Sequence, residues 1–205
     1  MEEKQEDIFH TISEASTEQI YKEKGSKFLG YAYPVSDVSE VEELLHALRK
    51  QHPKARHWCY AWQLGVEEPL FRFNDDGEPG NSAGKPIFGQ IQAFGLTDVL
   101  IVVVRYFGGT KLGVGGLINA YRSAAKLALE NAVIVEKKLQ NEIQVTFEYP
   151  HLDKIMRVIR EQGLEVLDQK MEMNCEYRLA VRKAWTQNVV RIFEELRCAK
   201  VKRLN

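Results

Sequence analysis

The feature that most constrains the fold is a run of six aliphatic residues, Val99–Val104, that passes directly into a glycine-rich segment. The run has no polar alternation, which is typical of a β-strand covered on both faces. We therefore expect a central strand with a packed layer on either side. The segment Arg105–Leu117 that follows holds five glycines and leads into an apolar helical pattern that ends near Asn131. Strand, glycine-rich loop and helix start thus follow one another.

The remainder of the first two thirds of the chain predicts further strands and helices. Residues 18–35 are rich in aromatic side chains and bounded by turn residues, so they predict a hairpin. Asp37 and Glu40 have the spacing of a capping box ahead of an apolar helical stripe. The remaining expected elements are strands at 58–64 and 70–73, a polar loop at 74–86 and a short helix at 87–94.

From about residue 139 the pattern changes to that of a second, smaller domain. Its expected elements come in the order strand, helix, strand, strand, helix, strand. This order is that of the split β-α-β, ferredoxin-like fold. We therefore predict an α+β protein of two domains, residues 1–138 and 139–205.

Composition argues against several classes of protein. The formal net charge is -1, so the chain lacks the basic excess that binds nucleic acid by charge alone, and any such site must be a local patch. Six aliphatic residues fall far short of the roughly 18 to 20 needed to cross a bilayer, so we expect no membrane span. The acidic stretch Met1–Asp7 is unlike a secretory signal, and the three cysteines form no Cys-x-x-Cys pair. We expect a cytoplasmic protein.

The glycine-rich segment is the first candidate site. Free backbone amides at a helix start attract anions, and glycines let a ligand come close to them. Arg105 and Lys111 add positive charge there. A dinucleotide fingerprint does not match, because Ile118 stands where its third glycine would be. The alternative is that the glycines serve only a tight turn and close helix–sheet packing.

The second candidate is the acidic loop Asn74–Pro86. It does not match a nucleotide-binding P-loop, because Pro79 and Pro86 replace a glycine and a hydroxyl residue that this loop requires. Pro86 suits the first position of a helix, with Lys85 beside its positive end. The acidic side chains could ligate magnesium or act as general acids and bases, or they could simply cap a solvated turn; they are Asp75, Asp76 and Glu78.

The third candidate is the segment Ala55–Trp62, in which His57 and Cys59 point to the same face of a predicted strand. Such a pair could be a nucleophile and its base or half of a metal site, but a cysteine packed in the core is the favoured interpretation. The aromatic side chains that alternate with them face the other way. They indicate core packing first and a base-stacking platform second.

Taken together, the segments 55–62, 75–86 and 102–117 resemble the signature of the IMPACT family, in its bacterial, YigZ-like branch. The resemblance implies an N-terminal domain of the ribosomal protein S5 domain 2-like fold and a C-terminal ferredoxin-like domain similar to the last domain of an elongation factor. Eukaryotic members regulate translation, with the help of an additional N-terminal domain. The family brings no established enzymatic mechanism, and fold analogy alone does not fix a function.

We therefore expect a non-enzymatic binding or regulatory protein linked to translation, which holds RNA or another phosphate-bearing anion without a cofactor. The cations and amides of separate loops would line one concave patch. One alternative is an enzyme that uses magnesium, held by the acidic loop, on a small phosphorylated or carboxylated substrate. Another is a protein partner that binds the exposed face of the C-terminal sheet. The predicted anion-binding residues are Arg56, His57, Lys85, Arg105, Tyr106, Gly108, Gly109, Lys111, Gly113, Gly115 and Gly116.

Overall fold

The computed structural model describes residues 7–204, so most of the acidic N-terminal stretch discussed above lies outside the described residues. Contacts divide the chain into two units. One is Phe9–Lys137; the other runs from Lys138 onward and includes Asp7 and Ile8. In residues 7–204, no helix combines the length and the apolar character needed to cross a membrane.

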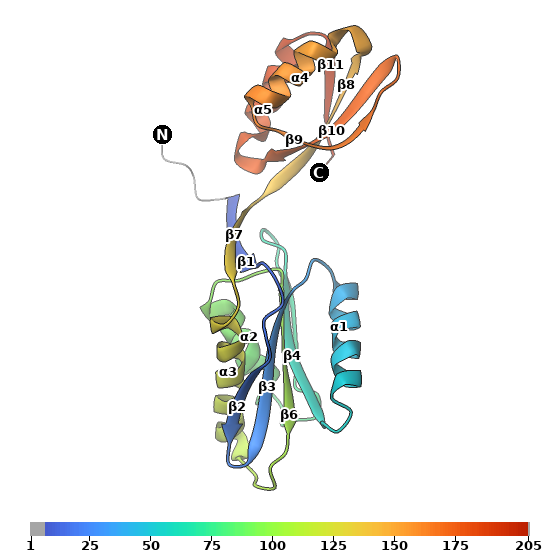
Figure 1. Ribbon diagram of the computed structural model, residues 1–205. Helices are drawn as coiled ribbons and strands as arrows, with labels where there is room; N and C mark the ends of the chain where they lie inside the picture. Colours follow the sequence, from blue (N-terminus) through green and yellow to red (C-terminus); the bar gives the residue numbers. More distant parts are fainter. Residues whose placement is uncertain (1–6, 205) are drawn as a thin grey trace. The chain divides into compact units, whose positions relative to one another are not determined.

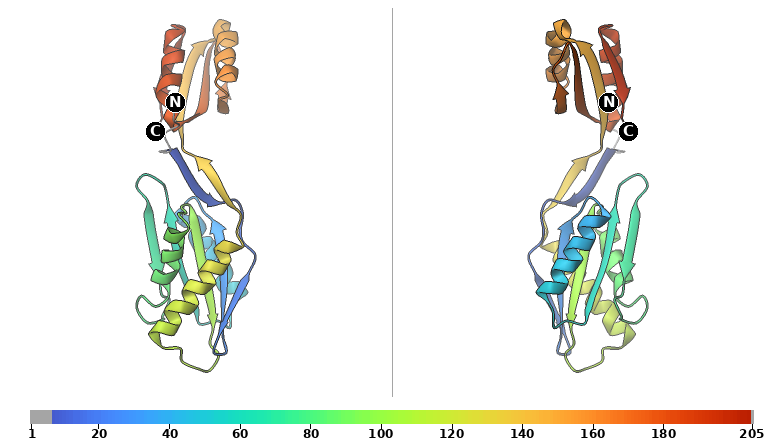
Figure 2. Two further views of the ribbon diagram at one scale, coloured as in Figure 1. Left: turned by 90° about the vertical axis from the view of Figure 1, so that its left-hand side faces the viewer. Right: turned by 90° about the vertical axis from the view of Figure 1, so that its right-hand side faces the viewer.

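The first unit is built on an antiparallel five-stranded sheet in the order β2-β3-β6-β4-β5 (Figures 1 and 2). As predicted, the aliphatic run forms the central strand, β6, and Val99–Val104 are fully buried. Helix α1 covers one face of the sheet, and α2 and α3 cover the other (Figure 1). The strands are β2 (Gln19–Glu23), β3 (Ser26–Pro34), β4 (His57–Leu64), β5 (Leu70–Asn74) and β6 (Val99–Tyr106). The helices are α1 (Val38–Gln51), α2 (Gly84–Ala93) and α3 (Gly113–Glu130).

Strand β4 shows how the two faces divide the side chains. Cys59 and Ala61 pack with α2 and α3, whereas Tyr60 and Trp62 pack with α1. This is the alternation that the sequence predicted. The aromatic side chains of β4 therefore belong to the core.

The helix starts differ partly from the prediction. Asp37 caps α1 by accepting a bond from the Glu40 amide at 3.0 Å, and the Glu40 carboxylate accepts from the Ser36 amide at 2.7 Å. Helix α2 begins at Gly84, three residues earlier than expected. Pro86 is therefore its third residue and not its first.

A separate two-stranded sheet, β1 (Ile8–Ile12) with β7 (Ile134–Lys138), was not predicted. The side chains of β7 are mostly exposed, so no apolar alternation marks it. The paired segments lie more than 100 residues apart in the chain, and no turn signal links them.

The second unit has the predicted ferredoxin-like order, with an antiparallel sheet arranged β11-β8-β10-β9 (Figure 1). Inward side chains such as Ile143 and Val145 form one core with both helices. Asp7 accepts two bonds from the Arg182 guanidinium at 2.8 and 3.0 Å, which hold the pKa of its carboxyl below the usual range. The elements are β8 (Gln140–Glu148), α4 (Leu152–Glu161), β9 (Glu165–Lys170), β10 (Asn174–Arg182), α5 (Thr186–Glu195) and β11 (Ala199–Arg203). The protein is thus α+β, with an S5 domain 2-like unit and a ferredoxin-like unit.

Candidate functional site

Several of the predicted site residues line one pocket of about 440 Å³ in the first unit. We call it the α3-start pocket, because the first turn of α3 forms one wall. Arg56 and His57 come from the start of β4, Glu78 from the loop before α2, and Arg105 from the end of β6. The pocket is lined by Arg56, His57, Glu78, Pro79, Arg105, Phe107, Lys111, Leu112, Gly113, Val114 and Leu117.

A buried charge pair forms the floor of this pocket. The Arg105 guanidinium donates to a Glu78 carboxylate oxygen at 2.5 Å, and their side chains are 7% and 4% exposed. The Tyr121 hydroxyl donates to the same oxygen at 2.7 Å. Arg105 also lies 5.4 and 5.5 Å from the rings of Phe28 and Phe107. Its charge is therefore largely engaged inside the protein, although its buried Nε has no hydrogen-bond partner among the described residues.

His57 lies beside this pair because strands β4 and β6 align it with Arg105. Its Nδ1 lies 2.9 Å from the carbonyl oxygen of Asp76. A carbonyl oxygen only accepts, so Nδ1 carries the proton, and Nε2 lies 3.9 Å from the Glu78 carboxylate. The imidazole is held in one orientation at the pocket wall.

Two cations of the pocket remain available. Arg56 and Lys111 are exposed, and neither has an ion pair with any of the described residues. The start of α3 lines the same pocket, and no side chain of residues 7–204 caps this helix. The first amides of a helix have no partner in the helix itself and carry its positive end. Positive charge and open amides therefore meet on one concave surface.

The glycines of the segment fall into two groups. A Cβ on Gly108 would lie 1.9 Å from the backbone of Gly25, so Gly108 serves the packing of two turns. Gly109 and Gly113 have φ of +87° and +71°, which require glycine. A Cβ on Gly115 would meet nothing within 4 Å. Neither packing nor a left-handed φ requires glycine at 115. Gly116 is closer to its surroundings, since a Cβ there would lie 3.0 Å from that of Leu112.

Two of the three carboxylates in the acidic loop, those of Asp75 and Asp76, hold the local backbone in place. Asp75 accepts from the amides of Asn81, Ala83 and Gly84 at 2.8 to 2.9 Å, and so fills the start of α2. Asp76 accepts from the Trp58 amide at 2.7 Å and pairs with Arg49 at 3.1 Å. In the part of the chain that the structure describes, no group of three or more His, Cys, Asp or Glu side chains is arranged to hold a metal. The interpretation that these acidic side chains cap the loop fits these bonds.

Six of the predicted anion-binding residues do not line the α3-start pocket, and this corrects the expectation of a single patch; they are Lys85, Tyr106, Gly108, Gly109, Gly115 and Gly116. Lys85 lines a different pocket, between α2 and α3. The Tyr106 hydroxyl bonds Nδ1 of His52 at 3.0 Å, in the core on the α1 side. Arg56 and Lys111 do converge, so the expectation holds for these two cations.

Cys59 is a core residue, as the favoured interpretation had it. It is fully buried, and its thiol donates to the carbonyl oxygen of Asp75 at 3.0 Å. Burial raises the pKa of the Cys59 thiol well above its usual value. A thiol held in this way is a poor nucleophile, because the thiolate is the reactive form.

Phe107 and Tyr121 belong to the site but were not predicted. Tyr121 lies on the apolar stripe of α3, where a tyrosine looks like any core residue. Phe107 is 52% exposed at the pocket rim. The sequence signal that could have identified Phe107 was an apolar ring in a glycine-rich loop.

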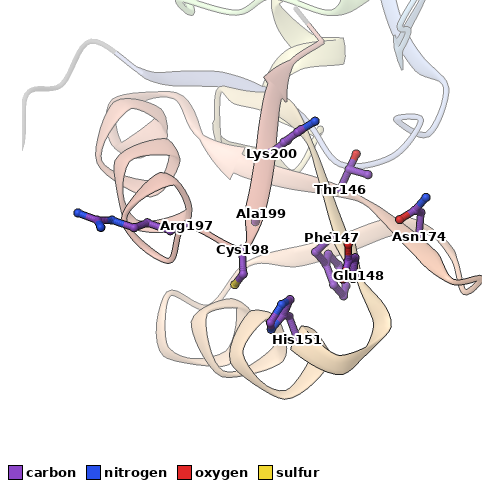
Figure 3. A pocket seen from close by; sticks show the side chains of 9 residues that line it. All are labelled: Thr146, Phe147, Glu148, His151, Asn174, Arg197, Cys198, Ala199 and Lys200. Carbon is purple, nitrogen blue, oxygen red and sulfur yellow. The ribbon is translucent and has the colours of Figure 1, made fainter.

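The second unit has a pocket of similar size, about 460 Å³. Figure 3 shows that its basic side chains do not converge, because Arg197 and Lys200 point away from one another. This cavity lacks a common focus of charge. The α3-start pocket is therefore the better candidate.

Comparison with known proteins adds independent information. The model of the Impact N-terminal domain matches residues 24–129. The chain is 35% identical over 178 residues to the IMPACT family member YvyE of Bacillus subtilis (strain 168), covering 87% of this chain and 82% of the relative. It is 31% identical over 160 residues to the IMPACT family member YigZ of Escherichia coli (strain K12), covering 77% and 78%.

A solved structure described as that of a hypothetical protein is similar over nearly the whole length. It has a TM-score of 0.76 and 25% identity, and the match covers 97% of this chain and 98% of that one. The matched domain model contains all the residues of the α3-start pocket. The chain belongs to the IMPACT family.

Proposed function

We propose that this chain is a non-enzymatic binding protein that holds a phosphate group of RNA in the α3-start pocket and acts as a regulator linked to translation in the cytoplasm. The observation that carries the proposal is the meeting of two unpaired cations, Arg56 and Lys111, with an uncapped helix start. The link to translation rests on what the family resemblance implies. The proposed partner is RNA or a ribosome-associated component.

The chemistry of the pocket favours binding over catalysis. Glu78, the nearest carboxylate, is already held by Arg105 and Tyr121. The imidazole of His57 has no nucleophile beside it, since the Cys59 thiol bonds a carbonyl oxygen on the buried face. Binding needs none of these groups to transfer a proton, and it needs no metal or cofactor.

The pocket suits a phosphate for electrostatic reasons. The amides at the start of α3 and the two cations donate several hydrogen bonds to one anion, and bonds to a charged group are worth about 1.5 to 3 kcal/mol each. The buried Arg105–Glu78 pair adds little net charge because its partners offset one another. The positive potential therefore comes from Arg56, Lys111 and the helix.

The test is the binding of a fluorescently labelled single-stranded RNA to the full chain, followed by anisotropy as a function of salt. We expect affinity to fall steeply as salt rises, and Lys111→Ala and Arg56→Ala each to weaken binding about tenfold. Lys50→Ala is the matched control, because Lys50 is exposed in the last turn of α1, on the opposite face of the sheet. An affinity that does not change with salt concentration would contradict the proposal, and so would a loss of affinity in Lys50→Ala as large as that in Lys111→Ala.

A further inference from the structure

A second basic hollow lies next to the α3-start pocket. We call it the α2–α3 groove; its volume is about 500 Å³. Lys85 and Arg122 are both exposed in it, and neither pairs with an acidic side chain among residues 7–204. The lining residues include no acid: they are Asn81, Lys85, Pro86, Gly89, Gln90, Ile118 and Arg122.

The two hollows follow one another along α3. Val114 lines the α3-start pocket, and Ile118 and Arg122 line the α2–α3 groove. Residues four apart lie on the same side of a helix, so these three side chains form one stripe. Val114 and Arg122 are separated by about 12 Å along the helix axis at roughly 1.5 Å per residue. A single phosphate cannot contact both ends of such a stripe.

A glycine keeps the groove open. Gly89 lies inside α2, where glycine is about 1 kcal/mol less favourable than alanine. A Cβ at Gly89 would meet nothing within 4 Å, and its φ is not in the left-handed region. Neither packing nor backbone conformation requires this glycine. The missing side chain of Gly89 thus leaves room for a ligand in the helical wall of the groove.

We propose that the two hollows are successive subsites for one single-stranded RNA segment of several nucleotides, with one phosphate in the α3-start pocket and a later one between Lys85 and Arg122. This inference rests on the proposed function and extends it from a single phosphate to an oligonucleotide. Phe107 and Val114 are 52% and 54% exposed at the first subsite. They offer apolar surface to a base, which a chain of bare phosphates would not use.

The experiment measures the affinity of the full chain for labelled oligouridylates from about 2 to about 12 nucleotides, a range that spans typical site sizes. For the unmodified protein, affinity should rise with length until both subsites are filled. The double variant Lys85→Ala/Arg122→Ala should bind the shortest RNA as the unmodified protein does and the longest at least tenfold more weakly. For long RNA, the slope of log affinity against log salt concentration should become shallower by about 0.7, because one phosphate contact is lost.

The outcomes separate the two proposals. If the double variant leaves long-RNA affinity unchanged while Lys111→Ala still weakens it, the second subsite is refuted and the proposed function stands. If the unmodified protein binds neither short nor long RNA, the proposed function fails. Inorganic polyphosphate serves as competitor. If it displaces RNA at equal phosphate concentration and Phe107→Ala has no effect, the assignment to RNA is overturned.

Discussion

Helices α2 and α3 both begin after a glycine-rich loop, yet only one of the two starts is open. At α2, Asp75 accepts from the amides of Ala83 and Gly84, so a carboxylate of the chain itself occupies the place that an external anion would take. At α3, no side chain in the described part of the chain caps the first turn. A glycine-rich loop before a helix is therefore not enough to define an anion site. What matters is whether the chain has already filled it.

The largest effect on stability is expected from removing the Asp75 carboxylate that caps the start of α2. Asp75→Ala removes the acceptor of three amides, two of them on buried residues. We expect a loss of about 3 to 5 kcal/mol in the free energy of unfolding of the first unit, measured with urea. Glu42→Ala, an exposed change on α1, is the control and should have almost no effect. A loss below about 1 kcal/mol for Asp75→Ala would mean that the α2 start does not depend on this cap.

Alanine substitutions at Gly108 and Gly115 should have opposite effects on stability. Gly108→Ala forces a Cβ into the backbone of Gly25, and we expect a loss of about 2 to 3 kcal/mol. Gly115→Ala adds a Cβ in open space within a helix and should stabilise the protein by about 0.5 kcal/mol. Thermal unfolding of each variant gives both numbers; a Gly115→Ala protein that is less stable than the unmodified chain would contradict this account.

At the start of α3, Glu78 is the acidic residue that most resembles Asp75 at the start of α2. Replacing Glu78 therefore tests the difference between the two helix starts further. Glu78→Gln keeps the shape of the side chain and removes one negative charge from the pocket floor. We expect RNA to bind about three- to tenfold more tightly, because the ligand no longer faces that charge. A weaker affinity in the same titration would indicate that the carboxylate itself contacts the ligand.

The smallest effect is expected at α1, whose capping residue, Asp37, is exposed to solvent. Hydrogen bonds from the Ser39 hydroxyl and the Glu40 amide hold the pKa of the Asp37 carboxyl below its ordinary value of 3.8. The ionised cap therefore stabilises the folded state above pH 3.8 and loses this effect as pH falls through the lower, folded-state pKa. Asp37→Ala should be slightly less stable than the unmodified protein at pH 7, and the difference should vanish in acid. A stability difference that grows on acidification contradicts this account.

Much of the fold follows from local patterns in the sequence. Val99–Val104 identified the central strand, the alternation around Cys59 identified two faces, and the Asp37 cap marked the start of α1. These features involve neighbours in the chain. The ferredoxin-like order of the second unit was equally visible, because its elements alternate regularly along the chain.

The site was less predictable, because its decisive contacts join distant positions. The acceptor at the α2 start, Asp75, lies eight and nine residues before the amides that it caps, so no local capping rule detects it. The partner of Arg105 lies 27 residues away, and only the structure reveals that this predicted cation is engaged. Where the Lys85 side chain points depends on where α2 begins. The sequence pattern predicted that start three residues too late.

The most direct test of the difference between the two helix starts is to follow backbone amides by NMR while a short oligouridylate is added. The account predicts that the amide signals of Gly113, Val114 and Gly115 shift most, while those of Ala83 and Gly84 stay in place. Shifts at Ala83 and Gly84, or shifts confined to residues 138–204, would contradict it.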